Sequence, residues 1–176
     1  MNPGGPGAGR RPIFAIVVMG VSGCGKTSVA LRLADRLQWD FAEADTFHSV
    51  ANVEKMRAGI PLGDDDRWPW LDAIAAYIDG ARARSRPCIV ACSALKRRYR
   101  ERLAHGHNDV RFAYLRGSFE TVAARMEGRT GHYMPASLLR SQYDALEEPG
   151  ADENAIVLSI ESPVDVLVEE VAATLS

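Results

Sequence analysis

Hydrophobic residues along the chain fall into short continuous runs that are separated by longer amphipathic stretches. Five of these runs have the length of a strand, over residues 13–19, 41–44, 88–92, 110–115 and 155–160. Continuous apolar runs of this kind are typical of strands that are buried on both faces of a parallel sheet. The pattern therefore predicts a five-stranded parallel sheet.

Helical periodicity fills the segments between these runs. Val29, Leu33 and Leu37 share one face of a helix expected over residues 28–37. Pro69 suits the first turn of a later helix, where its missing N–H would have no intrahelical partner anyway. This alternation of strands and helices predicts an α/β domain with helices on both faces of the sheet. Further helices are expected over residues 50–58, from about residue 96, through residues 122–126, up to about residue 146, and from Pro163 onward.

Composition narrows the class of protein without indicating an activity. The chain has 176 residues, of which 47% are hydrophobic and 25% charged, and its net charge is -2. These values fit one folded domain and give no overall field toward nucleic acid or an anionic membrane. No apolar run approaches the roughly 20 residues that span a bilayer. Residues 1–12 are rich in Gly and Pro, so we expect a flexible tail followed by a single domain over residues 13–176.

The three cysteines indicate a reducing environment. Their number is odd and their spacing is irregular, which matches neither a disulfide framework nor a zinc pattern. Cys88 and Cys92 flank an apolar run, so we expect buried thiols there. Reduced cysteines are typical of a cytoplasmic protein.

A glycine-rich motif directly follows the first predicted strand. The segment GVSGCGKT at residues 20–27 matches the phosphate-binding P-loop in full, with a strand before it and a helix after it. Its glycines allow a turn that points backbone N–H groups at phosphate oxygens, and the helix adds its positive dipole end. Lys26 is expected to reach the outer phosphates of a nucleotide, and the Thr27 hydroxyl to ligate Mg²⁺. The predicted nucleotide-binding residues of this segment are Gly20, Val21, Ser22, Gly23, Cys24, Gly25, Lys26, Thr27 and Ser28.

Two carboxylates follow the second predicted strand. Glu43 and Asp45 are two residues apart, so on a strand they would both project into the cleft at the carboxyl ends of the strands. Glu43 could hold Mg²⁺ through a water molecule, and Asp45 could accept the proton of an attacking hydroxyl group. The alternative is a pair of solvated carboxylates in a turn. The sequence thus predicts Lys26 and Asp45 as catalytic residues of one cleft.

Positively charged side chains occur at two positions in the sequence where a bound anionic ligand would account for them. Arg67 comes directly after three aspartates at a helix start, where an aspartate is expected to cap the helix but a cation is mildly unfavourable. Lys96 and Arg100 are four residues apart and share one helix face. Ser93, at the end of the third strand, could bond a substrate hydroxyl or carboxylate. These residues predict a site for a small anion.

A polar, glycine-punctuated segment over about residues 125–135 separates two predicted helices. It is flanked or occupied by Arg125, Arg129 and His132. A mobile loop that carries arginines can close over a nucleotide and offset the charge of a phosphoryl-transfer transition state. We therefore expect a mobile lid, with Arg129 counted among the catalytic residues.

With these residues assembled, the chain resembles the gluconokinases, which are related to shikimate kinases and nucleoside monophosphate kinases. The P-loop is shared by many families, whereas DDDR at residues 64–67 and CSALK at residues 92–96 are much more specific. Two positions depart from the family pattern: Ala44 replaces a glycine, which narrows the backbone freedom there, and Ser49 replaces a proline, which is expected to loosen the next turn. The matching segments are residues 19–27, 45–48 with Asn52, 54–56, 61–71, 92–96 with Tyr99 and Arg100, Arg129 with residues 131–132, and Gln142 with residues 146–149.

The resemblance implies ATP-dependent, Mg²⁺-dependent phosphorylation of D-gluconate at its 6-hydroxyl. It implies that Asp45 binds the acceptor and acts as the base, that Arg125 and Arg129 face ATP, and that Glu148 lies near the acceptor. Gluconate also suits the residues on chemical grounds, because it is a polyol with one carboxylate that needs cations and polar partners. A homodimer is a further expectation, since dimers occur among related proteins. The expected substrate-binding residues are Asp45, His48, Arg67, Ser93, Lys96, Arg100, His132 and Glu148.

Three alternatives stay open at this point. The acceptor could be another small polyol or a shikimate-like acid, or the chain could be a nucleotide-dependent switch without phosphotransfer. The chain has no Asn-Lys-x-Asp block of the kind that selects guanine. A nucleic-acid binder would depend on the basic residues 96–102 alone, and the near-neutral charge and the lack of an aromatic platform argue against it.

Overall fold

The computed structural model describes residues 12–129 and 136–175. In this part of the chain, five parallel strands form one sheet in the order β2-β3-β1-β4-β5. The prediction of a five-stranded parallel sheet is confirmed, with one strand in each of the expected apolar runs. The strands are β1 (Ala15–Met19), β2 (Asp40–Glu43), β3 (Cys88–Ala91), β4 (Val110–Arg116) and β5 (Ile156–Ser159).

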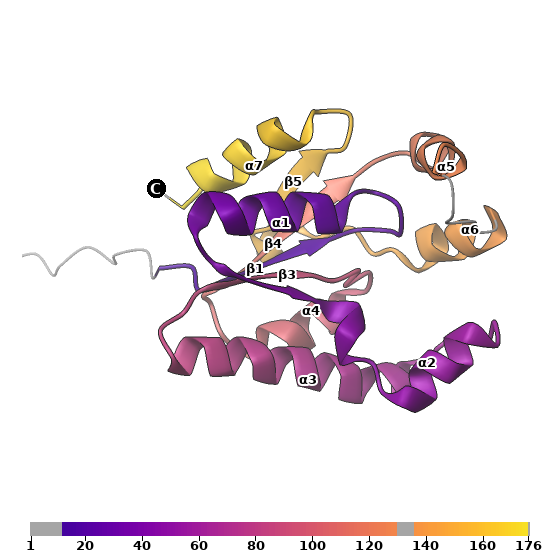
Figure 1. The fold of residues 1–176 in the computed structure, drawn as a ribbon, viewed down its shortest axis with the longest axis horizontal. Helices are drawn as coiled ribbons and strands as arrows, with labels where there is room; N and C mark the ends of the chain where they lie inside the picture. The colour runs from indigo at the N-terminus through magenta and orange to yellow at the C-terminus, as the bar shows by residue number, and fades with distance from the viewer. Residues whose placement is uncertain (1–11, 130–135, 176) are drawn as a thin grey trace, which may run out of the picture.

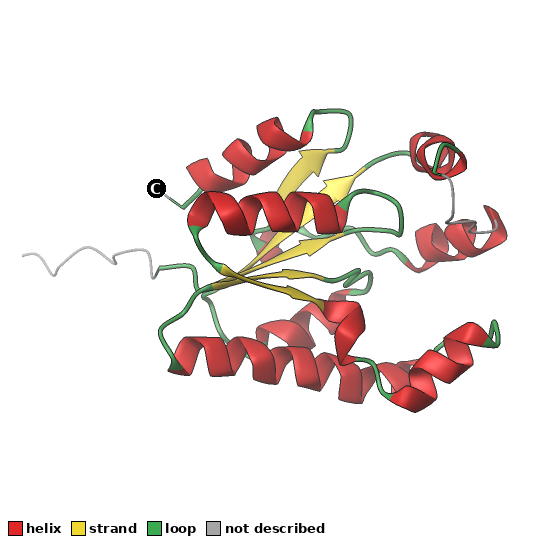
Figure 2. Cartoon of the chain, viewed as in Figure 1, coloured by secondary structure: helices red, strands yellow, loops and turns green. Residues whose placement is uncertain are grey.

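Helices cover both faces of this sheet (Figures 1 and 2), as the alternating pattern predicted. Helices α1 (Lys26–Leu37) and α7 (Val164–Ala173) pack together on one face, and α3 (Asp64–Ala83) and α4 (Arg97–Ala104) pack together on the other. Helices α5 (Phe119–Glu127) and α6 (Ala136–Ala145) lie together beyond the carboxyl ends of the strands, and α2 (Val50–Arg57) extends toward the same end. Two short 3₁₀ helices are η1 (Ala44–Phe47) and η2 (Ala151–Glu153).

The sheet separates two apolar clusters. One lies on the α1–α7 side and includes Ile16 and Leu33, and the other lies on the α3–α4 side and includes Val17 and Ile74. Successive residues of β1 alternate between the two clusters, because neighbours on a strand point to opposite faces. All five residues of β1 are 0% exposed. The central strand is therefore held on both faces and both edges. This fixes the point at which the following loop begins.

The third helix begins earlier than expected from Pro69. Helix α3 starts at Asp64 and has Pro69 inside it. The N-cap residue is Gly63 and not an aspartate, but the Asp66 carboxylate, at the third helical position, accepts a hydrogen bond from the Gly63 N–H at 3.0 Å. The prediction of Pro69 in the first turn was wrong, because the cap and the acidic first turn favour the earlier start.

The three cysteines are free and buried, as predicted for Cys88 and Cys92. Burial raises the pKa of Cys88 and the pKa of Cys92 to about 12, so both thiols stay protonated near neutral pH. None of the described helices is both long and apolar enough to cross a membrane.

Candidate functional site

The P-loop leads from β1 into α1 at the carboxyl edge of the sheet. Gly25 is the N-cap of α1 and has a left-handed backbone with φ 101°. A Cβ atom at this position would meet no atom within 4 Å, so the space in front of the loop is open, as a bound phosphate requires. At Gly23, in contrast, a Cβ would lie 2.6 Å from Met126 Cγ. One glycine therefore leaves room for a ligand, and the other lets α5 approach the loop.

Side chains at the end of the P-loop suit a nucleotide with its metal ion. The Thr27 hydroxyl donates a hydrogen bond to Glu43 Oε2 at 2.7 Å, which joins the first turn of α1 to the end of β2. A hydroxyl and a carboxylate side by side are the oxygen ligands that Mg²⁺ prefers. Lys26 Nζ donates to the Val21 carbonyl at 3.0 Å, so the ammonium group folds over the loop. The residues present thus fit a phosphate chain with Mg²⁺.

Helix α6 contacts the P-loop through Gln142, to which the sequence argument gave no role. Gln142 Oε1 accepts a hydrogen bond from the Ser22 N–H at 2.7 Å, and Nε2 donates to Ser22 Oγ at 2.9 Å. One amide group therefore fixes both the backbone and the side chain of a P-loop residue. The only signal in the sequence was the place of Gln142 in the family pattern.

Asp45 does not lie on a strand. β2 ends at Glu43, and the chain turns into η1, so the argument from strand alternation was wrong for Asp45. The side chain is exposed. Glu43 bonds Thr27 at the start of α1, and Asp45 follows two residues later in η1. Both carboxylates therefore lie at the carboxyl edge of the sheet despite the different local structure.

The two departures from the family pattern are both accommodated. Ala44 does not adopt a left-handed backbone, and its carbonyl accepts a hydrogen bond from Trp70 Nε1 at 2.8 Å, which ties η1 to α3. Ser49 is the N-cap of α2, where its Oγ accepts from the Asn52 N–H at 3.1 Å. The expectation that Ser49 loosens this turn was wrong, because serine is a favourable N-cap.

His48 is held between an aromatic ring and a buried amide. Its ring stacks on Trp70, with centroids 4.3 Å apart and an interplanar angle of 12°. The Nδ2 atom of the buried Asn52 lies 3.4 Å from His48 Nδ1. Burial lowers the pKa of His48, Asp45 acts in the opposite direction, and Arg67 lowers the pKa further. The imidazole is therefore kept neutral and is suited to hydrogen bonding with an uncharged group.

A cavity of about 360 Å³ lies between the start of α3 and the start of α4. The Tyr99 ring is bordered by Arg67 and Lys96, whose charged groups lie 5.6 and 5.5 Å from the ring centroid. Asp64 Oδ1 lies 3.5 Å from Lys96 Nζ and offsets part of this positive charge. A polar cavity of this size with two cations suits a small anionic ligand. Its lining residues are Leu62, Gly63, Asp64, Arg67, Leu95, Lys96, Tyr99 and Ala145.

Arg100 belongs to the fold and not to the cavity, which corrects the prediction that it contacts the substrate. Its side chain is 1% exposed, and it pairs with Glu153 through Nε–Oε2 at 2.6 Å and Nη2–Oε1 at 2.9 Å. Its Nη1 donates to the carbonyls of Ala94 at 3.1 Å and Leu95 at 3.2 Å. Spacing along a helix shows which residues share a face, but not how deeply each is buried. Arg100 therefore supports, from beneath, the loop that presents Lys96.

Ser93 and Glu148 lie at the same edge of the sheet as the P-loop. The Ser93 carbonyl accepts a hydrogen bond from the Gly20 N–H at 3.2 Å. Glu148 Oε1 accepts from the Tyr114 hydroxyl at 3.0 Å, and Tyr114 pairs in register with Met19, just before the P-loop. Burial raises the pKa of Tyr114, which keeps its hydroxyl a donor. The sequence argument missed Tyr114, whose only signal was its place near the end of a buried strand.

The predicted lid arginines lie at the end of α5. Arg125 Nη2 donates to the Ile160 carbonyl at 2.5 Å, while Arg129 is exposed just beyond the helix. Met126, the residue after Arg125, lies against Gly23, so this end of α5 is beside the P-loop. His132 lies outside the described residues, as do residues 130–135 of the predicted lid.

Together, the strand order, the P-loop after the central strand and the carboxylate beside a cationic cavity define a P-loop kinase of small molecules. The family described as an AAA domain matches residues 16–149. The chain is 48% identical over 162 residues to a gluconokinase of Gluconobacter oxydans, covering 92% of this chain and 90% of that protein. It is 40% identical over 153 residues to the thermoresistant gluconokinase of Escherichia coli, covering 86% and 87%. The crystal structure of a gluconokinase from Sinorhizobium meliloti matches with a TM-score of 0.84 and 44% identity, covering 94% and 93%. The chain belongs to the gluconokinase family.

The environment of His48 predicts how its protonation responds to two neighbours. We expect its pKa to lie below the ordinary histidine value of about 6.5. Asp45→Asn should lower this pKa further, because it removes the charge that favours the imidazolium, and Arg67→Ala should raise it. The check is an NMR titration of the His48 ring in the three proteins. Shifts of the opposite sign would contradict the placement of these charges.

Because the pKa of His48 is lower in the folded protein than in the unfolded chain, the contribution of His48 to stability should be lost as the pH falls from about 6.5 through the folded-state pKa.

The burial of Arg100 predicts a loss of stability when it is replaced. Arg100→Met leaves the Glu153 carboxylate nearly buried without its partner, so the free energy of unfolding should fall by about 3–5 kcal/mol. The Michaelis constant for the acceptor should also rise, because the loop before Lys96 loses its support. Denaturant unfolding and steady-state kinetics measure the two effects.

A double variant separates these effects. Arg100→Met combined with Glu153→Met removes both charges and should recover most of the stability. It should not restore acceptor binding, because the carbonyls of Ala94 and Leu95 still lack their donor. A single Arg100→Met variant with full stability and weakened acceptor binding would instead indicate direct contact with the acceptor.

Proposed function

We propose that this protein transfers the γ-phosphoryl group of ATP to the 6-hydroxyl of D-gluconate, giving ADP and 6-phospho-D-gluconate. The observation that carries this proposal is that the P-loop is bonded to both acceptor-side segments at one edge of the sheet. Thr27 bonds Glu43, two residues before Asp45. The Gly20 N–H bonds the Ser93 carbonyl, three residues before the cavity residue Lys96. Relatives named gluconokinase, at 40% and 48% identity over most of the chain, support the same reaction. The free, buried thiols support a cytoplasmic location.

On the nucleotide side, the P-loop holds the phosphates of ATP, and Lys26 moves from the Val21 carbonyl to the outer phosphate oxygens. Thr27 and Glu43 hold Mg²⁺. When bound, this ion neutralises charge that builds up on the phosphate oxygens. Arg125 in the last turn of α5 and Arg129 just beyond this helix supply further positive charge toward the transferred group.

On the acceptor side, Arg67 and Lys96 bind the carboxylate of gluconate in the cavity beside Tyr99. Neutral His48 and Ser93 bind its hydroxyl groups. Asp45 orients the 6-hydroxyl and accepts its proton as the new P–O bond forms. Because phosphoryl-transfer transition states are loose, orientation is as important a role for Asp45 as proton transfer.

Glu148 occupies a separate place in this scheme. Its carboxylate accepts a hydrogen bond from the Tyr114 hydroxyl, and Tyr114 pairs with Met19 at the end of β1, so Glu148 lies close to the start of the P-loop. We propose that it accepts a hydrogen bond from an acceptor hydroxyl. A carboxylate at this point would also disfavour an acceptor that carries a second negative charge.

The reaction is tested by ADP release with a panel of acceptors in the presence of Mg²⁺. We expect activity with D-gluconate and little with glucose, shikimate or AMP. Lys26→Ala should lower turnover by about 10²-fold or more, because it removes a charge that stabilises the transition state. Circular dichroism of this variant should stay native. Activity with AMP or shikimate, and none with gluconate, would exclude the proposed substrate.

A pair of variants separates chemistry from binding. Asp45→Asn is nearly isosteric and should lower turnover by roughly 10²–10⁴-fold with a smaller effect on gluconate affinity. Arg67→Ala should mainly raise the Michaelis constant for gluconate, by about tenfold or more.

Arg98→Ala is the matched control for Arg67→Ala. Arg98 also lies over the Tyr99 ring, at 5.8 Å, but its side chain does not line the cavity. We expect the Arg98 variant to keep both kinetic constants close to their original values.

Unchanged turnover and unchanged gluconate affinity in Asp45→Asn would remove Asp45 from the mechanism.

A further inference from the structure

A second group of ionisable side chains lies at the amino edge of the sheet, opposite the P-loop. The Asp109 carbonyl, just before β4, accepts hydrogen bonds from the N–H groups of Phe14 and Ala15 at the start of β1. The Asp109 carboxylate pairs with Arg82 at the end of α3, with Nη2–Oδ1 at 2.6 Å and Nε–Oδ2 at 2.8 Å. The proposed reaction takes place at the other edge and uses none of these groups.

Two histidines face one carboxylate beside this ion pair. His105 Nδ1 lies 3.1 Å from Asp79 Oδ2, and His107 Nε2 lies 3.5 Å from Asp79 Oδ1. One ligand atom from each of the three residues lies within 4.8 Å of the others. Within residues 12–129 and 136–175, no other three His, Cys, Asp or Glu side chains are grouped in this way.

The local backbone explains why both imidazoles reach the same carboxylate. His105 ends α4 in a left-handed conformation with φ 49°, and Gly106 follows with φ 76°. This tight reversal brings His107 back toward α3, where Asp79 lies near the end of the helix. The three side chains therefore come from α3, from the end of α4 and from the loop before β4.

Two imidazoles and a carboxylate are a donor set that suits Zn²⁺ and similar transition-metal ions. With metal–ligand bonds of about 2.0–2.2 Å, the ligand atoms of a tetrahedral site lie about 3.3 Å apart. His105 and His107 approach different oxygens of Asp79, at 3.1 and 3.5 Å, and one ligand atom from each of the three residues lies within 4.8 Å of the others, so the three atoms have to draw closer together to reach this value. The side chains of Asp79, His105 and His107 are 37%, 65% and 42% exposed, so small rotations can complete the site from solvent.

Arg82 is the group that opposes a cation here. Its Nη1 donates to Asp79 Oδ1 at 2.5 Å. However, the same guanidinium is paired bidentately with Asp109, so the two carboxylates outweigh its charge. The second carboxylate oxygen of Asp79, Oδ2, faces His105 and is not engaged by Arg82. The electrostatic balance around the imidazoles is therefore net negative when they are neutral.

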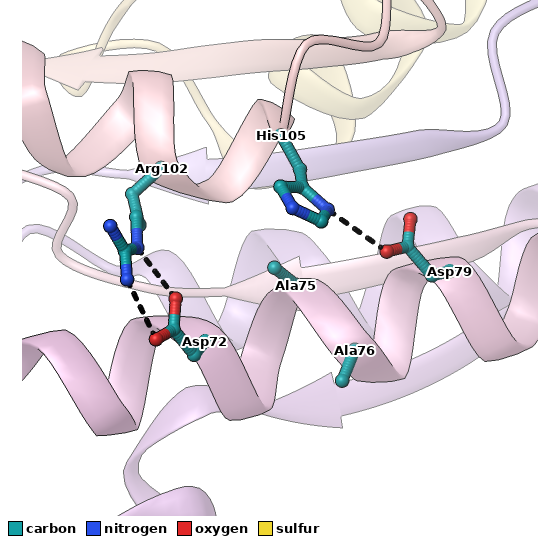
Figure 3. A pocket seen from close by; sticks show the side chains of 6 residues that line it. All are labelled: Asp72, Ala75, Ala76, Asp79, Arg102 and His105. Carbon is teal, nitrogen blue, oxygen red and sulfur yellow. Dashed lines mark hydrogen bonds and ion pairs between the residues drawn. The ribbon is translucent and has the colours of Figure 1, made fainter.

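The cluster opens onto a cavity of about 400 Å³ between α3 and α4. Figure 3 shows His105 and Asp79 pointing toward each other, with the small side chains of Ala75 and Ala76 beside them. Arg102 closes the other end through its bidentate pair with Asp72, at 2.6 and 2.8 Å. The cavity leaves space for water at the remaining coordination positions of a metal ion.

We propose that Asp79, His105 and His107 form a binding site for a divalent transition-metal ion of the Zn²⁺ type, with water completing its coordination. The bound ion joins α3 to the end of α4 and to the loop before β4. It therefore stabilises the helical layer on this face of the sheet and takes no part in phosphoryl transfer.

The test is titration of the full chain with Zn²⁺ by calorimetry, in the presence of excess Mg²⁺ to occupy oxygen-ligand sites. We expect one Zn²⁺ ion per chain, and at least tenfold weaker binding in His105→Ala and in His107→Ala. Asp72→Asn is the matched control, because Asp72 lines the same cavity from α3 without facing the histidines. This control should bind Zn²⁺ as the original protein does.

Two further measurements distinguish the site from general metal binding. Saturating Zn²⁺ should raise the melting temperature of the original protein but not that of the double variant with both histidines replaced by alanine. Co²⁺ should give visible absorption bands that the double variant lacks. The kinase activity of the double variant in Mg²⁺ should stay unchanged, which keeps this test independent of the proposed reaction. No Zn²⁺ binding by the original protein, or equal Zn²⁺ affinity in the double variant, would overturn the proposal.

Discussion

The parallel pairing of β1 with both β3 and β4 is the constraint on which the site depends. Because parallel strands end at the same edge, the loops that follow β1, β2 and β3 must meet there. β1 is fully buried, so the P-loop that follows it starts from a fixed point. The Gly20 N–H then bonds the Ser93 carbonyl, which joins the nucleotide loop to the loop on the acceptor side. The relative position of the two proposed substrates is thus set by strand register, before any side chain contributes.

A buried ion pair supports the acceptor side of this arrangement. Removing two charges from water is costly. The Arg100–Glu153 ion pair offsets this cost because the charged groups of both side chains are hydrogen-bonded. The remaining donors of Arg100 hold two carbonyls of a loop in which Ala94 has a left-handed backbone with φ 44°. The Glu147 N–H adds a bond to the Leu95 carbonyl at 2.8 Å. A loop strained at a non-glycine residue therefore keeps one shape, and its last residue presents a cation to the cavity.

The sequence predicted those parts of the structure that depend on local patterns, and it failed where depth and tertiary contacts decide. Strands and the P-loop are contiguous, so their apolar runs and glycines were sufficient evidence. Lys96 and Arg100 looked equivalent by helical spacing, yet one borders a cavity and the other lies beneath the loop. Asp45 was assigned to the right edge through a strand that ends at Glu43, because one more residue of extended chain cannot be distinguished from a turn in the sequence. Gln142 is recognisable only after α6 has been placed against the P-loop.

The charges around the cavity bear on which anion it can accept. Arg67 and Lys96 are the cations that line it, and Asp64, which lies against Lys96, offsets part of their charge. One carboxylate shared among these groups leaves a modest positive charge, and a neutral His48 adds none. Such a site matches a ligand with one carboxylate better than a phosphate with two charges, because a dianion would leave charge uncompensated in a partly buried space. The same balance that favours a sugar acid therefore argues against a nucleoside monophosphate, although both would reach the same P-loop.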